Sequence, residues 1–239
     1  MHCYSSKVAK KHPRLAMIDK RRYKRVAVEG IHGNMIFASN AKIFNISLGG
    51  VAIEINKRLT IGNEYTLKLQ SKEGHIDLKG VVVWSVLGSS VKDSRGDVIP
   101  IYQAGLKFTD VLTDKMSRLI EFIEKHKVSD EIRPDERLRG LRFKIHTEEE
   151  AFLNYSYSVK KISLGGMLIE TSQALDIENR FPMEIFLQDD KSINFVGRVA
   201  SCREIADTFP KQYDIGIEFV EMSDEDRKSL ESFIQPITL

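Results

Sequence analysis

The sequence predicts a mainly β protein made of two tandem antiparallel β-barrels, each closed by a C-terminal α-helix. Two observations carry this prediction. Short runs of alternating apolar residues follow one another at the spacing typical of strands in a barrel or sandwich. The same order of runs, ending in a helical pattern, then occurs a second time.

Strand signals begin at Arg25 and continue to Phe108, separated by turns rich in Gly, Asn and Lys. Alternation is typical of a strand with one buried face. The apolar residues of the expected strands are, in order, Val26 and Val28; Met35 to Ala38; Ile43; Val51, Ile53 and Ile55; Tyr65, Leu67 and Leu69; Ile76 and Leu78; Val81 to Trp84; and Tyr102, Ala104, Leu106 and Phe108.

A helix is predicted after the last of these strands, with Thr113 or Asp114 as its N-cap. Its apolar residues recur at i, i+3, i+4 and i+7. They are Met116, Leu119, Ile120 and Ile123. Since such a stripe usually faces its own domain, we expect the helix to cover the barrel.

The second half of the chain repeats the first. The segment SLGGVAIE at 47–54 recurs as SLGGMLIE at 163–170. Two further pairs of segments are 102–108 with 213–219, and 119–123 with 230–234. The second helix has its own capping pattern, Ser223-x-x-Asp226. A repeat of this extent indicates two domains of the same fold.

Changes in composition set the expected boundaries. Residues 1–19 are basic and weakly periodic, which predicts a flexible N-terminal arm. We expect a first domain at 20–126, a linker at 127–133 that ends just before Pro134, and a second domain at 134–239 that folds on its own.

The overall composition excludes several classes of protein. A hydrophobic share of 42% is ample for packed cores, and a net charge of +2 does not indicate a general polyanion-coating protein. No apolar run reaches the length of a membrane span, and the N-terminus is too polar for a signal peptide, so we expect a cytoplasmic protein. Cys3 and Cys202 indicate neither a disulfide framework nor a zinc site.

The positive charge is concentrated in one hexamer, Lys20-Arg21-Arg22-Tyr23-Lys24-Arg25, which is followed by the turn-like motif Asn45-x-Ser47-x-x-Gly50. Arginine can grip phosphate oxygens or a guanine edge with two parallel hydrogen bonds. Asn and Ser side chains can complement other base edges, and glycine allows a close approach to the backbone. Either motif alone has an ordinary explanation, as a solvated basic run or as a common turn.

Together, Arg21-x-x-x-Arg25 and Asn45-x-Ser47-x-x-Gly50 resemble the signature of the PilZ family of cyclic di-GMP receptors. The resemblance implies a β-barrel that binds cyclic di-GMP and uses no cofactor. Under it, the ligand-binding residues would be Lys20, Arg21, Arg22, Arg25, Asn45, Ser47, Gly49, Gly50 and Trp84.

The resemblance also implies a role for each of these residues. Arg21 and Arg25 would hold phosphates and a guanine Hoogsteen edge, and Asn45 and Ser47 would meet another guanine edge. Lys20 stands at the position that influences whether one ligand or a stacked pair is bound. The lone Trp84 could stack on a base, although partial burial in the core is the favoured explanation.

The second repeat carries a degraded signature. Aligned on the glycines, Lys161 replaces Asn45; aligned on the following strand, Arg142 matches Arg25 and Leu138 stands in place of Arg21. We therefore expect the second domain to have a structural or protein-contact role.

The sequence predicts a receptor or effector that changes conformation or partner contacts when it binds cyclic di-GMP, with a protein partner of unspecified identity. No P-loop, GxGxxG, HExxH or nucleophile elbow is present, so an enzyme is not expected. The alternative is a DNA-binding or protein-adaptor module that uses the basic cluster. The balanced charge and the lack of a recognition-helix pattern do not favour nucleic acid as the partner.

Overall fold

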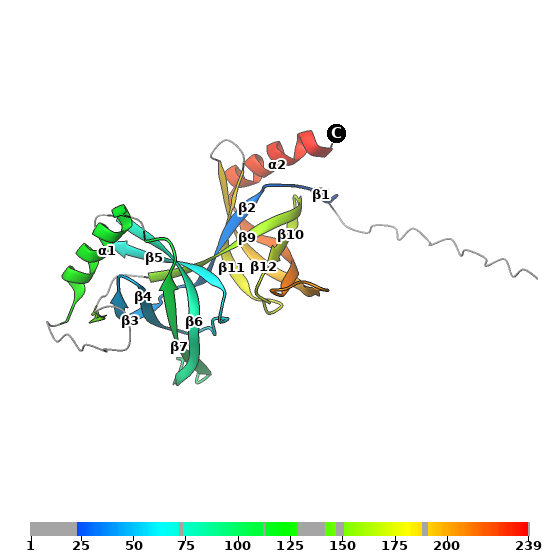
Figure 1. Ribbon diagram of the computed structural model, residues 1–239. Coiled ribbons are helices and arrows are strands. Elements are labelled where there is room, and N and C mark those ends of the chain that lie inside the picture. The colour runs from blue at the N-terminus through cyan, green and yellow to red at the C-terminus, as the bar shows by residue number, and fades with distance from the viewer. Residues whose placement is uncertain are drawn as a thin grey trace, which may run out of the picture.

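The computed structural model describes residues 23–71, 74–111, 113–128, 142–146, 151–187 and 191–238. The predicted arm at 1–19, the residues Lys20, Arg21 and Arg22, and most of the predicted linker lie outside this described part. Strands dominate, and they form two antiparallel β-barrels with one helix on each (Figure 1). The predicted fold class is confirmed.

Barrel 1 is built mainly from the first repeat. Its strands are β3 (Lys42–Ser47), β4 (Gly50–Ile55), β5 (Glu64–Ser71), β6 (Gly74–Lys92) and β7 (Val98–Phe108), and its helix is α1 (Thr113–His126). They are hydrogen-bonded in the order β5-β6-β7-β4-β3. In β5 and the first half of β6, buried residues alternate with more exposed ones, as the sequence pattern predicts. In β4 the three consecutive residues Val51, Ala52 and Ile53 are all buried.

Barrel 2 is built mainly from the second repeat. Its strands are β9 (Ala151–Ser163), β10 (Gly166–Thr171), β11 (Arg180–Phe186), β12 (Ser192–Ile205) and β13 (Gln212–Met222), and its helix is α2 (Asp224–Thr238). Their order, β9-β10-β13-β12-β11, is that of the corresponding strands in barrel 1. The pseudo-symmetry that the repeat predicts is therefore present in the strand pairing.

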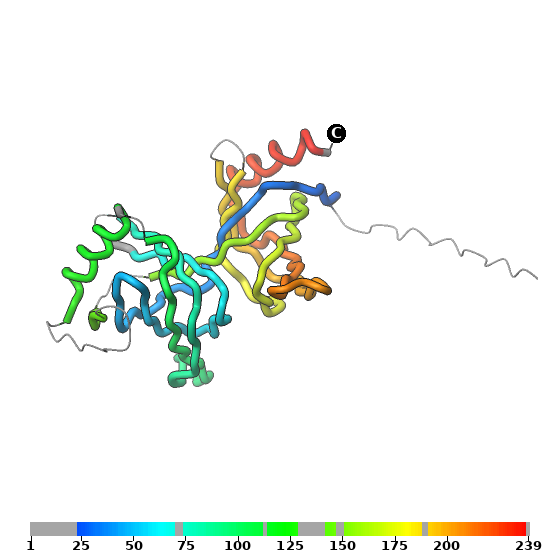
Figure 2. The backbone as a smooth tube through the Cα atoms, in the orientation of Figure 1, coloured from blue at the N-terminus to red at the C-terminus, as the bar shows by residue number. Residues whose placement is uncertain are grey.

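The first strands of the two repeats are exchanged between the barrels. From the first repeat, β1 (Val26–Ala27) pairs with β9, and β2 (His32–Ala38) pairs with both β9 and β11. From the second repeat, β8 (Phe143–Lys144) pairs with β3, and the start of β9 pairs with β5. Each repeat thus completes the barrel of the other, and β2 runs beside β9 between the lobes (Figure 2).

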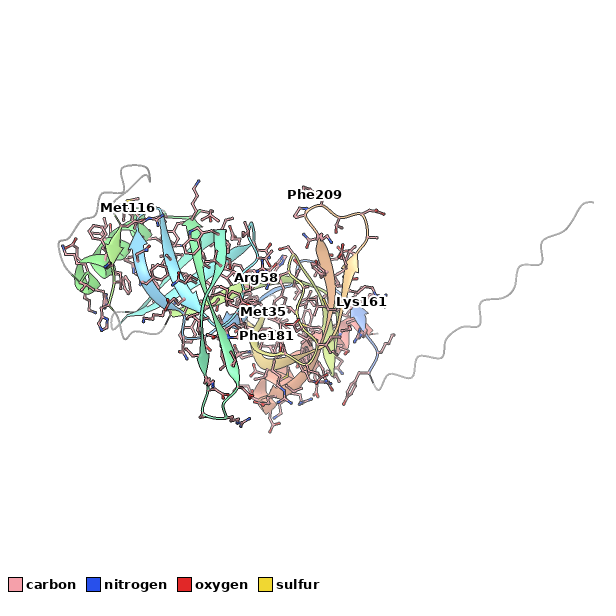
Figure 3. The ribbon with its side chains drawn as sticks, turned by 90° about the horizontal axis from the view of Figure 1, so that it is seen from below. Met35, Arg58, Met116, Lys161, Phe181 and Phe209 are labelled. Carbon is pink, nitrogen blue, oxygen red and sulfur yellow. The ribbon has the colours of Figure 1, made fainter. Side chains whose placement is uncertain are left out.

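The exchanged strands join the two barrels through one continuous hydrophobic core. The ring centre of Phe37 in β2 lies 5.5 Å from the ring centre of Tyr65 in β5. It lies 6.1 Å from the ring centre of Phe181 in β11. The ammonium of Lys57 lies 4.3 Å from the centre of the Phe181 ring, a cation–π contact at the same junction. Met35, also on β2, is fully buried and lies beside Phe181 in Figure 3.

Each helix packs one apolar stripe on its barrel. In α1 the buried residues are Leu119, Phe122 and Ile123, whereas Met116 and Ile120 of the predicted stripe are 38% and 43% exposed. In α2 the predicted cap is present, because the backbone N–H of Asp226 donates to Ser223 Oγ at 3.0 Å. No helix in the described part of the chain is long and apolar enough to cross a membrane.

Candidate functional site

Residues 45–50, here called the Asn45 turn, join β3 to β4 at the edge of barrel 1. The hydroxyl of Ser47 donates to the Gly50 carbonyl at 3.2 Å and accepts from the Gly49 N–H at 3.3 Å. Ser163 makes the same bond to Gly166 in the second repeat, at 2.9 Å. Ser47 is buried and its hydroxyl is used inside the turn, so its main effect is to fix the shape of the turn.

The two glycines of the Asn45 turn have different surroundings. A Cβ on Gly50 would overlap the carbonyl oxygen of Leu106 in β7, so only glycine permits this close approach of two strands. Gly49 is exposed, and no described atom lies within 4 Å of the position of a Cβ. Gly50 therefore holds the turn against the barrel, and Gly49 leaves its outer side open.

Asn45 begins a row of side chains on the outer face of barrel 1. The pairing register places Asn45 opposite Ala52, Ala52 opposite Gly105, and Gly105 opposite Trp84. Three strand spacings of about 4.8 Å separate Asn45 from Trp84. A bulged residue precedes each end of the row, Phe44 before Asn45 and Val83 before Trp84. Bulges re-aim side chains and are common beside binding sites.

Small residues in the middle of this row let the indole of Trp84 lie flat on the sheet. A Cβ on Gly105 would overlap the indole nitrogen, so the ring covers that glycine. Trp84 is half-buried on the outer face, outside the hydrophobic core in which the sequence favours it. The exposed part of the ring offers a stacking surface on the face that carries Asn45.

The equivalent turn of barrel 2, residues 161–166, is here called the Lys161 turn, and it is closed. Its row consists of Ala27, Lys161, Leu168, Gly216 and Ser201, so a leucine replaces Ala52 and a serine replaces Trp84. A Cβ on Gly165 would lie 2.8 Å from the Tyr23 ring, which covers this turn. The neighbouring Lys160 is bound to Asp214 at 2.9 Å and to Glu170, and these contacts raise its pKa.

Among the residues that the structure describes, Arg25 and Asn45 of the signature do not lie together in one barrel. Arg25 precedes β1, which pairs with the end of β9 beside Lys161, whereas Asn45 lies on β3. Figure 1 shows β1 and β3 at opposite ends of the molecule, and Figure 3 shows Lys161 far from barrel 1. Asn45, Ser47, Gly49, Gly50 and Trp84 do share one face of barrel 1.

Sequence reasoning missed the residues that shape this face. Ala52 and Gly105 matter because they are small, a signal that becomes visible when Ala52 is compared with Leu168 in the other repeat. Lys144 was missed as a neighbour of Asn45, since only the strand exchange pairs the two residues.

A cavity of about 900 Å³ lies elsewhere, where β2, β5, β9, β11 and β12 meet. Its lining includes Lys68 but also the carboxylates of Glu184, Glu221 and Asp226. These negative charges oppose an anionic ligand, so this cavity is a poor phosphate site. No cluster of three or more metal-binding side chains occurs among the described residues.

Comparison with solved structures found similar chains of low sequence identity. MrkH of K. pneumonia is 14% identical, with 87% of this chain and 85% of that chain covered and a TM-score of 0.33. The PilZ domain of Escherichia coli YcgR with c-di-GMP is 15% identical, with 44% and 90% covered and a TM-score of 0.30. The Borreliella burgdorferi PlzA protein in complex with c-di-GMP is 12% identical, with 89% and 94% covered and a TM-score of 0.23.

No match to a curated protein was found. The family model of the PilZ domain matches twice, over residues 19–125 and 132–235, which together make up most of the chain. The two matches coincide with the two sequence repeats, and both repeats end with a helix on a β-barrel. The chain therefore belongs to the PilZ domain family, of which it contains two copies.

Proposed function

We propose that this chain is a cyclic di-GMP receptor and that the ligand binds on the outer face of barrel 1. The observation that carries the proposal is the open Asn45 turn, which shares its face with a half-buried tryptophan. Membership of the PilZ family supports the choice of ligand. We also propose that the chain acts as an effector in the cytoplasm and not as an enzyme.

The proposed roles follow from the contacts of each residue. The Asn45 amide donates to and accepts from a guanine edge, and Trp84 stacks on a base. Ser47 and Gly50 hold the shape of the turn, while the open side of Gly49 admits the ligand. After the cost of ordering the ligand and the side chains, a few such contacts give a binding free energy of about −8 kcal/mol. This corresponds to a dissociation constant in the micromolar range.

The basic cluster of Lys20, Arg21, Arg22 and Arg25 remains part of the proposal, as a phosphate-binding cluster. Arg25 is half-buried beside the end of β9, which supports a role at barrel 2. We further propose that ligand binding changes conformation and the contacts with a protein partner. Since each repeat completes the barrel of the other, a shift of one exchanged segment reaches both barrels.

Binding should be visible in the fluorescence of Trp84, because it is the chain's only tryptophan. We expect saturating cyclic di-GMP to change its intensity and to give a micromolar dissociation constant that agrees with calorimetry. Linear GMP and cyclic di-AMP serve as controls, and neither should compete. If cyclic di-GMP produces no heat and no fluorescence change, the proposed function is wrong.

The substitution Asn45→Ala should weaken cyclic di-GMP binding about tenfold, because it removes hydrogen bonds to a base edge worth about 1–1.5 kcal/mol. Calorimetry would measure this loss. Lys161→Ala is the matched control, since Lys161 occupies the equivalent position in barrel 2. Equal losses in the two variants would argue against a site on barrel 1.

A further inference from the structure

The segment that leads into the second repeat lies against the Asn45 turn of the first. Its strand β8 pairs with β3 so that Lys144 lies opposite Asn45, and Phe143 lies opposite the fully buried Ile46. Lys144 therefore shares the outer face with Asn45, because side chains alternate along a strand. Arg142 directly precedes β8, and an extended backbone at this residue would place its side chain on the same face.

The same register, continued by one residue, brings Arg142 level with Ser47 at the heart of the turn. Barrel 2 supports this continuation of the register. There the pair of Val26 with Ile162 is equivalent to the pair of Phe143 with Ile46 in barrel 1. Continued from that pair, the register brings Tyr23 level with Gly165, and the Tyr23 ring does contact that glycine. In barrel 2 the segment before β1 thus stays beside the Lys161 turn, which supports the same course for Arg142 beside the Asn45 turn.

The two cations beside the Asn45 turn are available to a ligand. Arg142 and Lys144 are both exposed, and neither side chain forms a hydrogen bond or ion pair with a residue in the described part of the chain. A guanidinium can hold a phosphate through two parallel hydrogen bonds, and an ammonium adds a point charge. By contrast, Arg25 is level with Ser163 of the Lys161 turn, which Tyr23 covers.

We propose that Arg142, assisted by Lys144, supplies the phosphate-binding cations of the Asn45 turn, so that the ligand site combines the turn of one repeat with the leading segment of the other. This inference rests on the proposed function, and it transfers the cationic half of the site from Arg25 to Arg142. The crossed pairing of β8 with β3 is its structural basis.

The composite site would also tie the ligand to α1. The β8 segment is held on its other side by the chain that leaves α1: Val128 N–H donates to the Lys144 carbonyl at 3.1 Å, and His146 N–H donates to the His126 carbonyl at 3.1 Å. A ligand whose phosphate is held by Arg142 and whose guanine edge is held by Asn45 would bridge β8 to β3 and fix this segment between the turn and the end of α1.

Calorimetric titration of the full chain with cyclic di-GMP tests the proposal. Arg142→Ala should weaken binding by roughly tenfold or more, as expected for loss of a charge-assisted contact, and Lys144→Ala should weaken it by a smaller factor. Arg25→Ala is the comparison variant, because it occupies the equivalent position in the other barrel, and it should weaken binding less than Arg142→Ala does. Arg203→Ala is the control, since Arg203 is an exposed arginine on β12 of barrel 2, and this variant should leave the affinity unchanged. Thermal melts of all variants should coincide with the wild type.

The outcomes separate this inference from the proposed function. Wild-type binding that Arg25→Ala abolishes and Arg142→Ala spares would overturn the composite site while the receptor function stands. Similar losses in the two variants would overturn it too. Absence of binding by the wild-type chain would overturn the proposed function and the composite site with it.

Discussion

A chain that lacks residues 1–38 is expected to lose the folded structure of barrel 2, although every residue of the second repeat remains. The deletion removes β1 and β2, and β2 supplies four pairing positions along β11, from Met183 to Phe186. It also removes Met35, which is fully buried. Truncation of one such side chain costs about 2–5 kcal/mol, a large part of the 5–15 kcal/mol that stabilises a typical domain.

Circular dichroism during thermal unfolding would measure this effect. We expect residues 39–239 to show a smaller and less cooperative transition than the full chain. Removal of residues 1–22 is the control, because it leaves every described strand in place. A peptide of residues 23–38, added in trans, should restore the transition of the truncated chain by binding its folded form.

This expectation differs from the one that the sequence repeat suggests, in which residues 134–239 fold alone. That fragment keeps β12 on one side of β11 but lacks β2, which pairs with the other side. A cooperatively folded fragment 134–239 would show that its own leading strand can replace β2, and the requirement for the exchange would then be contradicted.

The barrels and helices could be predicted because their signals are local. Alternating apolar residues, the double glycine and the capping pattern each fix a short segment, and the repeat doubles the evidence. The errors in the stripe of α1 have a local cause as well. Phe122 and Ile123 face the barrel and Ile120 faces solvent, a rotation of the helix that spacing alone does not determine.

The exchange of strands could not be predicted from these signals, because both repeats carry a similar first strand that suits either barrel. The two repeats differ in the connection that follows this first strand. The first repeat turns between β2 and β3 at Asn40, which has a positive φ of 58°. The second repeat has Tyr155, Ser156 and Tyr157 in the matching region, and β9 runs straight through it. Asparagine tolerates the left-handed conformation, whereas a continuous strand excludes it.

The candidate site depends on the same long-range pairing. Asn45 and the turn glycines could be found by spacing, but Trp84 reaches their face only through the register of four strands. The neighbourhood of Arg25 and Arg142 depends on which barrel each leading segment joins. A sequence signature therefore identifies the candidate binding residues, but it does not determine which of them lie close together in the folded protein.

The substitution Gly50→Ala is expected to destabilise barrel 1 by about 2–3 kcal/mol, the second large effect that the structure predicts. The new methyl group would overlap the Leu106 carbonyl, which is backbone and has no room to rotate away. Relief requires β4 to move from β7, and this breaks the pairing of Gly50 with Lys107 and of Val51 with Leu106. Chemical denaturation would measure the loss as a lower midpoint.

Gly49→Ala is the matched control one residue away. Its position is exposed and open among the described residues, and its φ is not in the left-handed region, so stability should change by less than about 0.5 kcal/mol. Its effect should appear in ligand binding instead, since a methyl group would narrow the open side of the Asn45 turn. If Gly50→Ala leaves the midpoint unchanged, or if Gly49→Ala lowers it equally, the division of roles between the two glycines is wrong.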